Sequence, residues 1–183
     1  MTGQRVWQGR KLHFVGVGGA GMSGLALIAL ELGATVSGSD SGQSAVLDEL
    51  KRRGAHIHHG HSGDNVPEAA DLVHTSAVDA SNVEVALANS RGQSVLHRSQ
   101  LLGEMTRLKK TIAVTGTHGK TTTSAMVLRA LRGAGIQAGW VIGAGLQEGE
   151  PSAGWGSADW LVVEADESDR SLLNLDAEVA VVT

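Results

Sequence analysis

The chain has 183 residues and 25 glycines, about twice the usual share, and it has no cysteine. A glycine content without a three-residue period excludes collagen, and 42% hydrophobic residues exclude a disordered chain. The lack of cysteine excludes disulfides, thiolate zinc sites and iron–sulfur clusters. A net charge of −4 with scattered basic residues predicts no nucleic-acid partner. No apolar run reaches the roughly 18–20 residues that span a bilayer, so we expect no membrane insertion and a cytoplasmic location.

Strands and helices alternate along the first 108 residues. The predicted strands cover 12–17, 34–38, 55–58, 71–75 and 94–96. The predicted helices cover 25–32, 44–53, 82–90 and 99–108. This alternation predicts parallel βαβ units, and so an α/β fold with a Rossmann-like parallel-sheet domain over residues 1–108.

The same order of strand, glycine loop and helix begins again after residue 108. We therefore place a domain boundary there and predict that residues 109–183 form the start of a P-loop α/β ATPase domain. A strand over 111–115 and a helix over 120–133 open it, and a loop rich in Gly, Ser and Pro covers 143–157. The remaining predicted strands cover 138–142, 160–164 and 178–183. Because no helix follows the last strand to cover it, we expect a natural chain to continue beyond Thr183.

The first glycine loop, residues 16–21, reads GVGGAG and matches the pattern G-x-G-x-x-G between a strand and a helix. Gly18 lets backbone amides approach a diphosphate, and Gly21 permits close packing of the helix on the strand. The helix N-terminus favours the negative charge of a phosphate. Asp40 ends the second strand, where an acidic residue usually contacts a ribose hydroxyl. The loop predicts a nucleotide site, and a tight turn without a ligand is the alternative.

The second loop, Thr115 to Thr122, contains the Gly-Lys-Thr core of a phosphate-binding loop. The strict pattern fails because Val114 stands at the first glycine position. The chemistry is retained, since Lys120 can neutralise phosphate charge and the Thr121 hydroxyl can bind Mg²⁺. A Gly-Lys turn that merely starts a helix is the alternative.

Four carboxylates follow the strand over 160–164, within the segment Glu164–Asp169. Acidic residues at a strand end beside a phosphate loop are typical ligands of the nucleotide-bound metal. The alternative is an acidic surface turn. His56, His58, His59 and His61 also lie close together, but without cysteine and with only Asp64 nearby we favour solvated strand-end histidines over a metal site.

Three segments together resemble the Mur ligases of peptidoglycan synthesis: residues 16–24, 116–123 and 164–169. Their order and spacing match over the whole chain. His118 and the complete acidic segment are most similar to the member that adds L-alanine. The resemblance implies an ATP- and Mg²⁺-dependent amide ligase that joins L-alanine to UDP-N-acetylmuramate through an acyl phosphate.

The resemblance also implies roles for individual residues. Gly16, Gly18, Gly19, Ala20, Gly21, Met22, Ser23, Asp40, Ser76 and Arg98 would bind the UDP substrate. Gly116, Thr117, His118, Gly119, Lys120, Thr121 and Thr122 would bind ATP. Thr121 and Glu164 would hold the metal, and Lys120, Glu164 and Glu167 would act in catalysis.

The sequence departs from the family's pattern at two places, and two other functions are compatible with its motifs. Arg170 stands where the family usually has a small residue, and the family's later Asn and Asp-His segment is absent. We therefore expect these 183 residues alone to bind a UDP ligand without turnover. The first loop also suits an NAD-binding oxidoreductase or sensor, although such a protein does not need the second loop. A nucleotide-binding module without catalysis is the other alternative.

Overall fold

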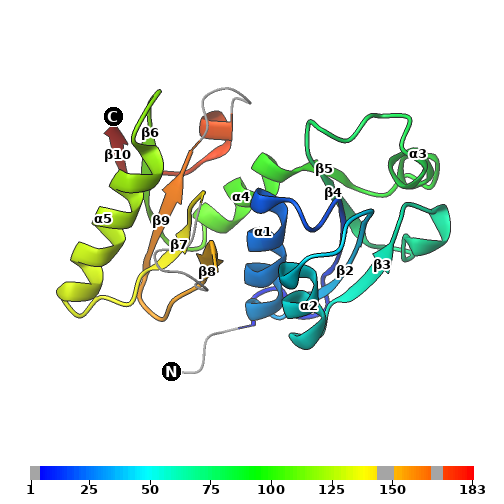
Figure 1. Ribbon diagram of the computed structural model, residues 1–183, viewed down its shortest axis with the longest axis horizontal. Helices are drawn as coiled ribbons and strands as arrows, with labels where there is room; N and C mark the ends of the chain where they lie inside the picture. The colour runs from blue at the N-terminus through cyan, green and yellow to red at the C-terminus, as the bar shows by residue number, and fades with distance from the viewer. Residues whose placement is uncertain (1–4, 144–150, 166–170) are drawn as a thin grey trace. The chain divides into compact units, whose positions relative to one another are not determined.

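The computed structural model describes residues 5–143, 151–165 and 171–183, drawn in colour in Figure 1. The contacts between residues define two compact units, Met1–Arg98 and Ser99–Thr183. Helix α4 (Arg98–Thr106) therefore groups with the second unit, whereas the predicted boundary near residue 108 assigns it to the first domain. That boundary stays a prediction.

A parallel five-stranded sheet forms the first unit, in the order β3-β2-β1-β4-β5. Its strands are β1 (Lys11–Val15), β2 (Thr35–Asp40), β3 (His56–His59), β4 (Asp71–His74) and β5 (Val95–His97). Phe14 in the central strand pairs with Gly38 of β2 on one side and Val73 of β4 on the other. The order reverses between β1 and β4, and ligands of such sheets bind beyond the strand ends at this point. The predicted Rossmann-like fold is confirmed.

Helices cover both faces of this sheet. Helices α1 (Ala20–Glu31) and α2 (Ala45–Arg52) contact each other and lie on one face (Figure 1). Helix α3 (Val83–Ser90) follows β4 and packs on the other face, as right-handed crossovers running in opposite directions require. Residues Leu25 to Ala29 of α1 are all buried, because this helix is apolar on every side. The turn η1 (Gly63–Asn65) lies between β3 and β4.

The second unit has a five-stranded sheet in the order β10-β6-β9-β7-β8. Its strands are β6 (Lys110–Thr115), β7 (Gly139–Val141), β8 (Ala153–Gly154), β9 (Trp160–Glu164) and β10 (Val179–Val182). All neighbours are parallel except β7 and β8. Helix α5 (Lys120–Gly133) packs its buried Leu128 against Ala138 and Val162. The turn η2 (Ser171–Asn174) precedes β10.

The predicted strands and helices are all present, with two differences in detail. Helix α1 begins at Ala20 and not at residue 25, because its first turns contain Gly21 and Gly24, whose low helix propensity concealed the start. The expected loop over 143–157 contains the short strand β8. A Cβ atom on Gly154 would lie 2.5 Å from Cη2 of Trp140, so the missing side chain lets this strand pair with β7.

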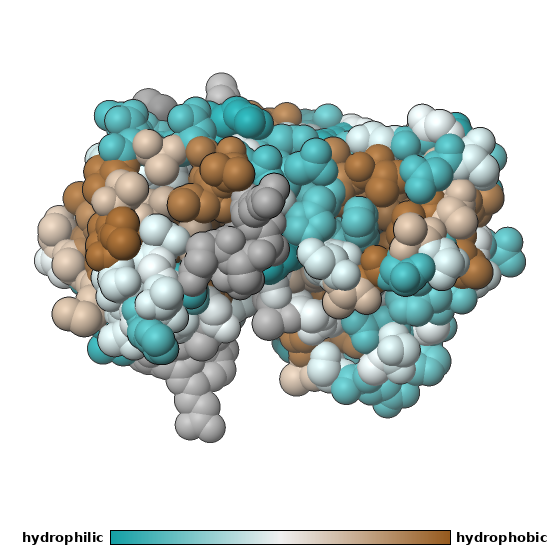
Figure 2. All heavy atoms as spheres, turned by 90° about the horizontal axis from the view of Figure 1, so that it is seen from above, coloured by the Kyte–Doolittle hydropathy of each residue, from teal (hydrophilic) through white to brown (hydrophobic). Residues whose placement is uncertain are grey.

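Exposed apolar side chains are spread over separate elements. Figure 2 shows hydrophobic and hydrophilic residues intermingled on one face of the molecule. The large exposed apolar residues include Val83 on α3, Met126 on α5 and Leu173 in η2. Single exposed apolar residues of this kind are normal and indicate no docking surface. Among the residues that the structure describes, no helix has both the length and the apolar character needed to cross a membrane.

Candidate functional site

The end of β2 holds the first glycine loop in place. The amides of Gly16 and Val17 donate to the Ser39 carbonyl at 2.8 and 3.0 Å. The next amide, of Gly18, donates to Oδ2 of Asp40 at 2.7 Å. Two consecutive residues of β2 therefore engage three consecutive loop amides.

Asp40 contacts Gly18 directly. A Cβ atom on Gly18 would lie 2.8 Å from Oδ2 of Asp40, so the carboxylate requires the glycine. The sequence pattern predicts that the Gly18 amide contacts a diphosphate and that Asp40 contacts a ribose. In the structure, without a ligand, the amide and the carboxylate form a hydrogen bond with each other. The other oxygen of Asp40 accepts from the amide of Gly42 at 2.8 Å.

Arg98 lies over the first turn of α1. A Cβ atom on Gly21 would come within 2.5 Å of Nη1 of Arg98. The sequence pattern predicts that Gly21 makes room for strand β1, whereas in the structure it makes room for this guanidinium. The first amides of a helix have no intrahelical acceptor, and with a guanidinium they form a good environment for an anion. Met22 and Ser23 are buried, so their side chains face the interior.

The ends of β4 and β5 bring further polar groups to the same edge of the sheet. Ser76, which follows β4, has its Oγ 3.1 Å from Nε2 of His97 at the end of β5. The rings of His97 and His74 make an edge-to-face contact with centroids 5.7 Å apart. Ser76 was predicted from the sequence, but neither histidine was, although each is the last residue of its strand.

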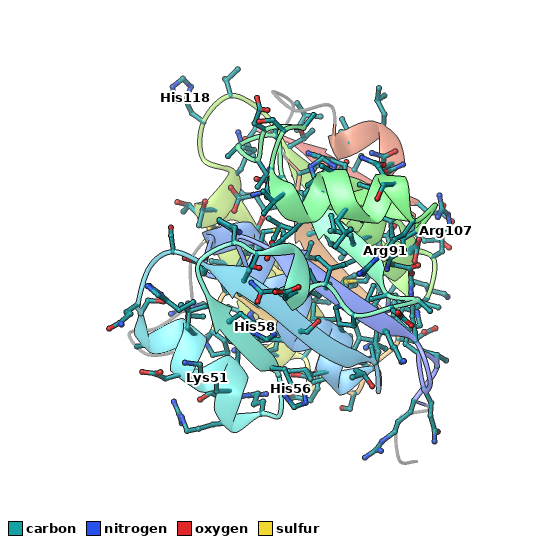
Figure 3. All side chains as sticks on the ribbon, turned by 90° about the vertical axis from the view of Figure 1, so that its right-hand side faces the viewer. Lys51, His56, His58, Arg91, Arg107 and His118 are labelled. Atoms are coloured by element: carbon teal, nitrogen blue, oxygen red, sulfur yellow. The ribbon has the colours of Figure 1, made fainter. Side chains whose placement is uncertain are left out.

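A cavity of about 280 Å³ opens between α2 and β3, and two residues of its lining, Gly42 and His59, are neighbours of Asp40. Figure 3 shows Lys51 of α2 with His56 and His58 of β3 on the same side of the first unit. The histidines of β3 are exposed, as predicted. The cavity is lined by Gly42, Gln43, Ser44, Leu47, Asp48, Lys51, Ile57, His58 and His59.

His61 is exposed, as predicted, but its ring also contacts buried groups of the first unit. Its Nδ1 lies 3.0 Å from Oγ of Ser39 and 3.2 Å from Oε2 of Glu84, a completely buried carboxylate. Burial by itself would raise the pKa of Glu84, but interactions with His13, Ser39, Asn65 and His61 outweigh it and lower the pKa to about 2. Glu84 carries no signal in the sequence, since an acidic residue in the first turn of a helix is ordinary.

The second glycine loop joins β6 to α5 and brings the predicted metal ligands together. Gly119 caps α5 at a φ of 80°, which favours glycine. Nζ of Lys120 donates to the Gly116 carbonyl at 2.7 Å. Oγ1 of Thr121 lies 2.9 Å from both carboxylate oxygens of Glu164, which ends the neighbouring strand β9. The amide of Gly143 also donates to Glu164, at 2.7 Å.

Other predicted residues of this loop differ in their placement. His118 is exposed, and Figure 3 shows it at the tip of the loop, pointing away from the rest of the protein. Its Nδ1 lies 3.3 Å from Oγ1 of Thr117. Glu167 and Arg170 lie outside the described residues.

The oxygen ligands that the structure places near Lys120 are of the kind that Mg²⁺ prefers. Thr121 supplies a hydroxyl and Glu164 a carboxylate, both hard oxygen ligands. Within residues 5–143, 151–165 and 171–183, no three His, Asp or Glu side chains form a group that could hold a metal. One carboxylate and one hydroxyl match a metal that takes its other ligands from phosphate and water.

The fold and both loops define a class of protein: an α/β nucleotide-binding protein with a Rossmann-like unit and a P-loop unit. A model of the "Mur ligase family, catalytic domain" matches residues 11–110. The chain belongs to the Mur ligase family, which confirms the resemblance seen in the sequence.

Relatives and solved structures agree with this family. A UDP-N-acetylmuramate–L-alanine ligase of Laribacter hongkongensis is 49% identical over 95% of the chain, and one of Rhizorhabdus wittichii is 44% identical over 94%. The chain spans 37% and 36% of their lengths. The UDP-N-acetylmuramate-alanine ligase of Thermotoga maritima has a TM-score of 0.86 at 30% identity, covering 94% of this chain and 40% of that one. The UDP-N-acetylmuramate:L-alanyl-gamma-D-glutamyl-meso-diaminopimelate ligase of Neisseria meningitides has a TM-score of 0.84 at 27% sequence identity. The match covers 93% of this chain and 59% of that one.

Proposed function

We propose that this chain belongs to an ATP-dependent ligase that joins L-alanine to UDP-N-acetylmuramate. The observation that carries the proposal is the 44–49% identity, over nearly the whole chain, to relatives named for that reaction. Solved structures alone do not separate the alanine ligase from the tripeptide ligase, since their TM-scores are 0.86 and 0.84. ATP and a UDP-linked sugar are cytoplasmic nucleotides, so we place the protein in the cytoplasm.

The first unit would bind the UDP part of the substrate. Arg98 and the first turn of α1 offer positive charge and amides for the diphosphate. The cavity beside Asp40 is a suitable place for the nucleoside. Asp40 already accepts two amides, but a carboxylate has about four acceptor positions and can still receive a ribose hydroxyl.

The second unit would bind ATP and Mg²⁺. Lys120 would move from the Gly116 carbonyl to the phosphates, and Thr121 and Glu164 would hold the metal. When bound, Mg²⁺ neutralises charge on the transferred phosphoryl group. Glu167 is proposed to act close to the reacting groups.

Two chemical steps account for the product. The lactyl carboxylate attacks the γ-phosphorus of ATP, which gives an acyl phosphate and ADP. The amine of L-alanine then attacks the acyl carbon, phosphate leaves and the amide loses a proton. Lys120 contributes electrostatic stabilisation, the largest contribution that a protein makes to phosphoryl transfer.

Calorimetry on the 183-residue chain tests the proposal. UDP-N-acetylmuramate and UDP should bind, and Mg·ATP should bind independently of them. NADH should not bind. Binding of NADH without any response to UDP compounds would favour the oxidoreductase or sensor and overturn the ligase proposal.

A further inference from the structure

Glu84 is a buried charge with no role in the proposed reaction. It lies in the first turn of α3, and its side chain has no exposed surface. Oε2 accepts from Oγ of Ser39 at 2.5 Å and lies 3.2 Å from Nδ1 of His61. Oε1 accepts from Nδ2 of Asn65 at 3.0 Å and from the amide of Ser62 at 3.2 Å. The carboxylate thus joins α3 to β2 and to the segment after β3.

Ser39 connects this buried carboxylate to the glycine loop. Its hydroxyl donates to Glu84, while its carbonyl accepts the amides of Gly16 and Val17. The next residue, Asp40, accepts the amide of Gly18. Any movement of Ser39 therefore changes the positions of the loop amides.

We propose that Glu84 is a positioning residue for the substrate site: through Ser39, it fixes the glycine loop in the shape that receives the UDP diphosphate. This inference rests on the proposed function, because the ligand is the UDP substrate. Glu84 touches no ligand itself, and its effect passes through one side chain.

The ionised form of the side chain suits this position. The surrounding groups donate or can donate, and a carboxylate only accepts. Nε2 of His13 also faces Oε2, at 3.8 Å, and this buried nitrogen has no hydrogen-bond partner among the described residues. A neutral amide of the same shape would point an NH₂ group at these donors, and a buried mismatch of that kind is costly.

Glu84→Gln tests the inference, with Glu68→Gln as the matched control. Glu68 is exposed in the same unit, so its substitution removes the same charge without touching the cluster. In the 183-residue chain, Glu84→Gln should weaken UDP-N-acetylmuramate binding about tenfold, the value of one charge-assisted hydrogen bond. Affinity for Mg·ATP, which depends on the second unit, should not change. Wild-type affinity in a folded Glu84→Gln variant would overturn the proposal.

Amide hydrogen exchange separates positioning from general stability. In Glu84→Gln, the amides of Gly16 and Val17 should exchange faster, and the amide of Phe14 in β1 should not. Ser39→Ala should also speed exchange at Gly16 and Val17 and not at Phe14. This variant tests the positioning role if Glu84→Gln fails to fold. The double variant should bind within about twofold of Glu84→Gln, because both changes interrupt one pathway. Additive losses, or unchanged exchange at the loop, would refute the proposal. If the wild type fails to bind UDP compounds, the proposed function is wrong, and the exchange data still test the positioning.

Discussion

The buried carboxylate of Glu84 predicts how the first unit responds to acid. Its pKa lies at about 2, below the usual 4.5, because interactions with His13, Ser39, Asn65 and His61 outweigh the cost of burial. A lowered pKa in the folded state stabilises the fold above the pKa of the unfolded chain. That contribution is present above pH 4.5 and is lost as the pH falls through 2. At 1.36 kcal/mol per pH unit, it amounts to about 3 kcal/mol of unfolding free energy.

The measurement compares wild type and Glu84→Gln in urea between pH 7 and pH 2. Trp7 is buried in the first unit, and the other three tryptophans lie in the second, so the indole NMR signal of Trp7 reports the first unit alone. The wild type should be about 3 kcal/mol more stable at pH 7. The difference should shrink between pH 4.5 and pH 2, where protonated Glu84 resembles glutamine.

Other carboxylates cancel in this comparison. A hydrogen bond from Arg53 lowers the pKa of Glu49, and one from Ser81 lowers the pKa of Asp79, but both groups are present in both proteins. A stability difference that does not depend on pH, or that grows below pH 4.5, would refute the assignment of an ionised Glu84.

Three further substitutions test the two loops. Lys120→Ala should weaken ATP binding at least about tenfold in calorimetry and leave UDP-N-acetylmuramate affinity unchanged; loss of both affinities would contradict independent sites. Thr121→Val removes the hydroxyl beside Glu164, so ATP affinity should lose most of its dependence on Mg²⁺, and a retained dependence would exclude Thr121 as a ligand. Gly18→Ala places a Cβ atom 2.8 Å from Oδ2 of Asp40, so the Trp7 signal should report a loss of about 1–2 kcal/mol of stability. An unchanged stability would show that the loop has room for a side chain.

Local patterns explain why the sequence predicted the strands and helices so well. Each βαβ unit carries its own apolar run and its own glycine stop, such as Gly33 after α1 and Gly54 after α2. Right-handed crossovers then determine which face of the sheet each helix covers, whereas the order of the strands comes from the fold. Strand β8 was missed because two residues have no periodicity, and its position depends on the ring of Trp140.

Partners that are distant in sequence explain why the contacts at the site could not be predicted from the loops alone. Gly18 and Gly21 were correctly identified as positions that need glycine, but their neighbours are Asp40 and Arg98, 22 and 77 positions away. Glu84 accepts from Ser39 across 45 positions. A sequence pattern shows which residue is constrained, but only the fold shows which group constrains it.

The two glycine loops use their amides in opposite ways. In the first, the amides of Gly16, Val17 and Gly18 already donate to the end of β2, so the diphosphate site that we propose uses the first amides of α1 and Arg98 instead. In the second, the amides of Thr117 and His118 have no hydrogen-bond partner in the described part of the chain, and Lys120 belongs to the loop itself. The cation beside the first loop, Arg98, therefore belongs to helix α4, whereas the second loop contains its own cation, Lys120. This difference would explain why G-x-G-x-x-G alone does not distinguish UDP from NAD: Arg98 and the cavity between α2 and β3, which we propose as parts of the substrate site, lie outside the motif.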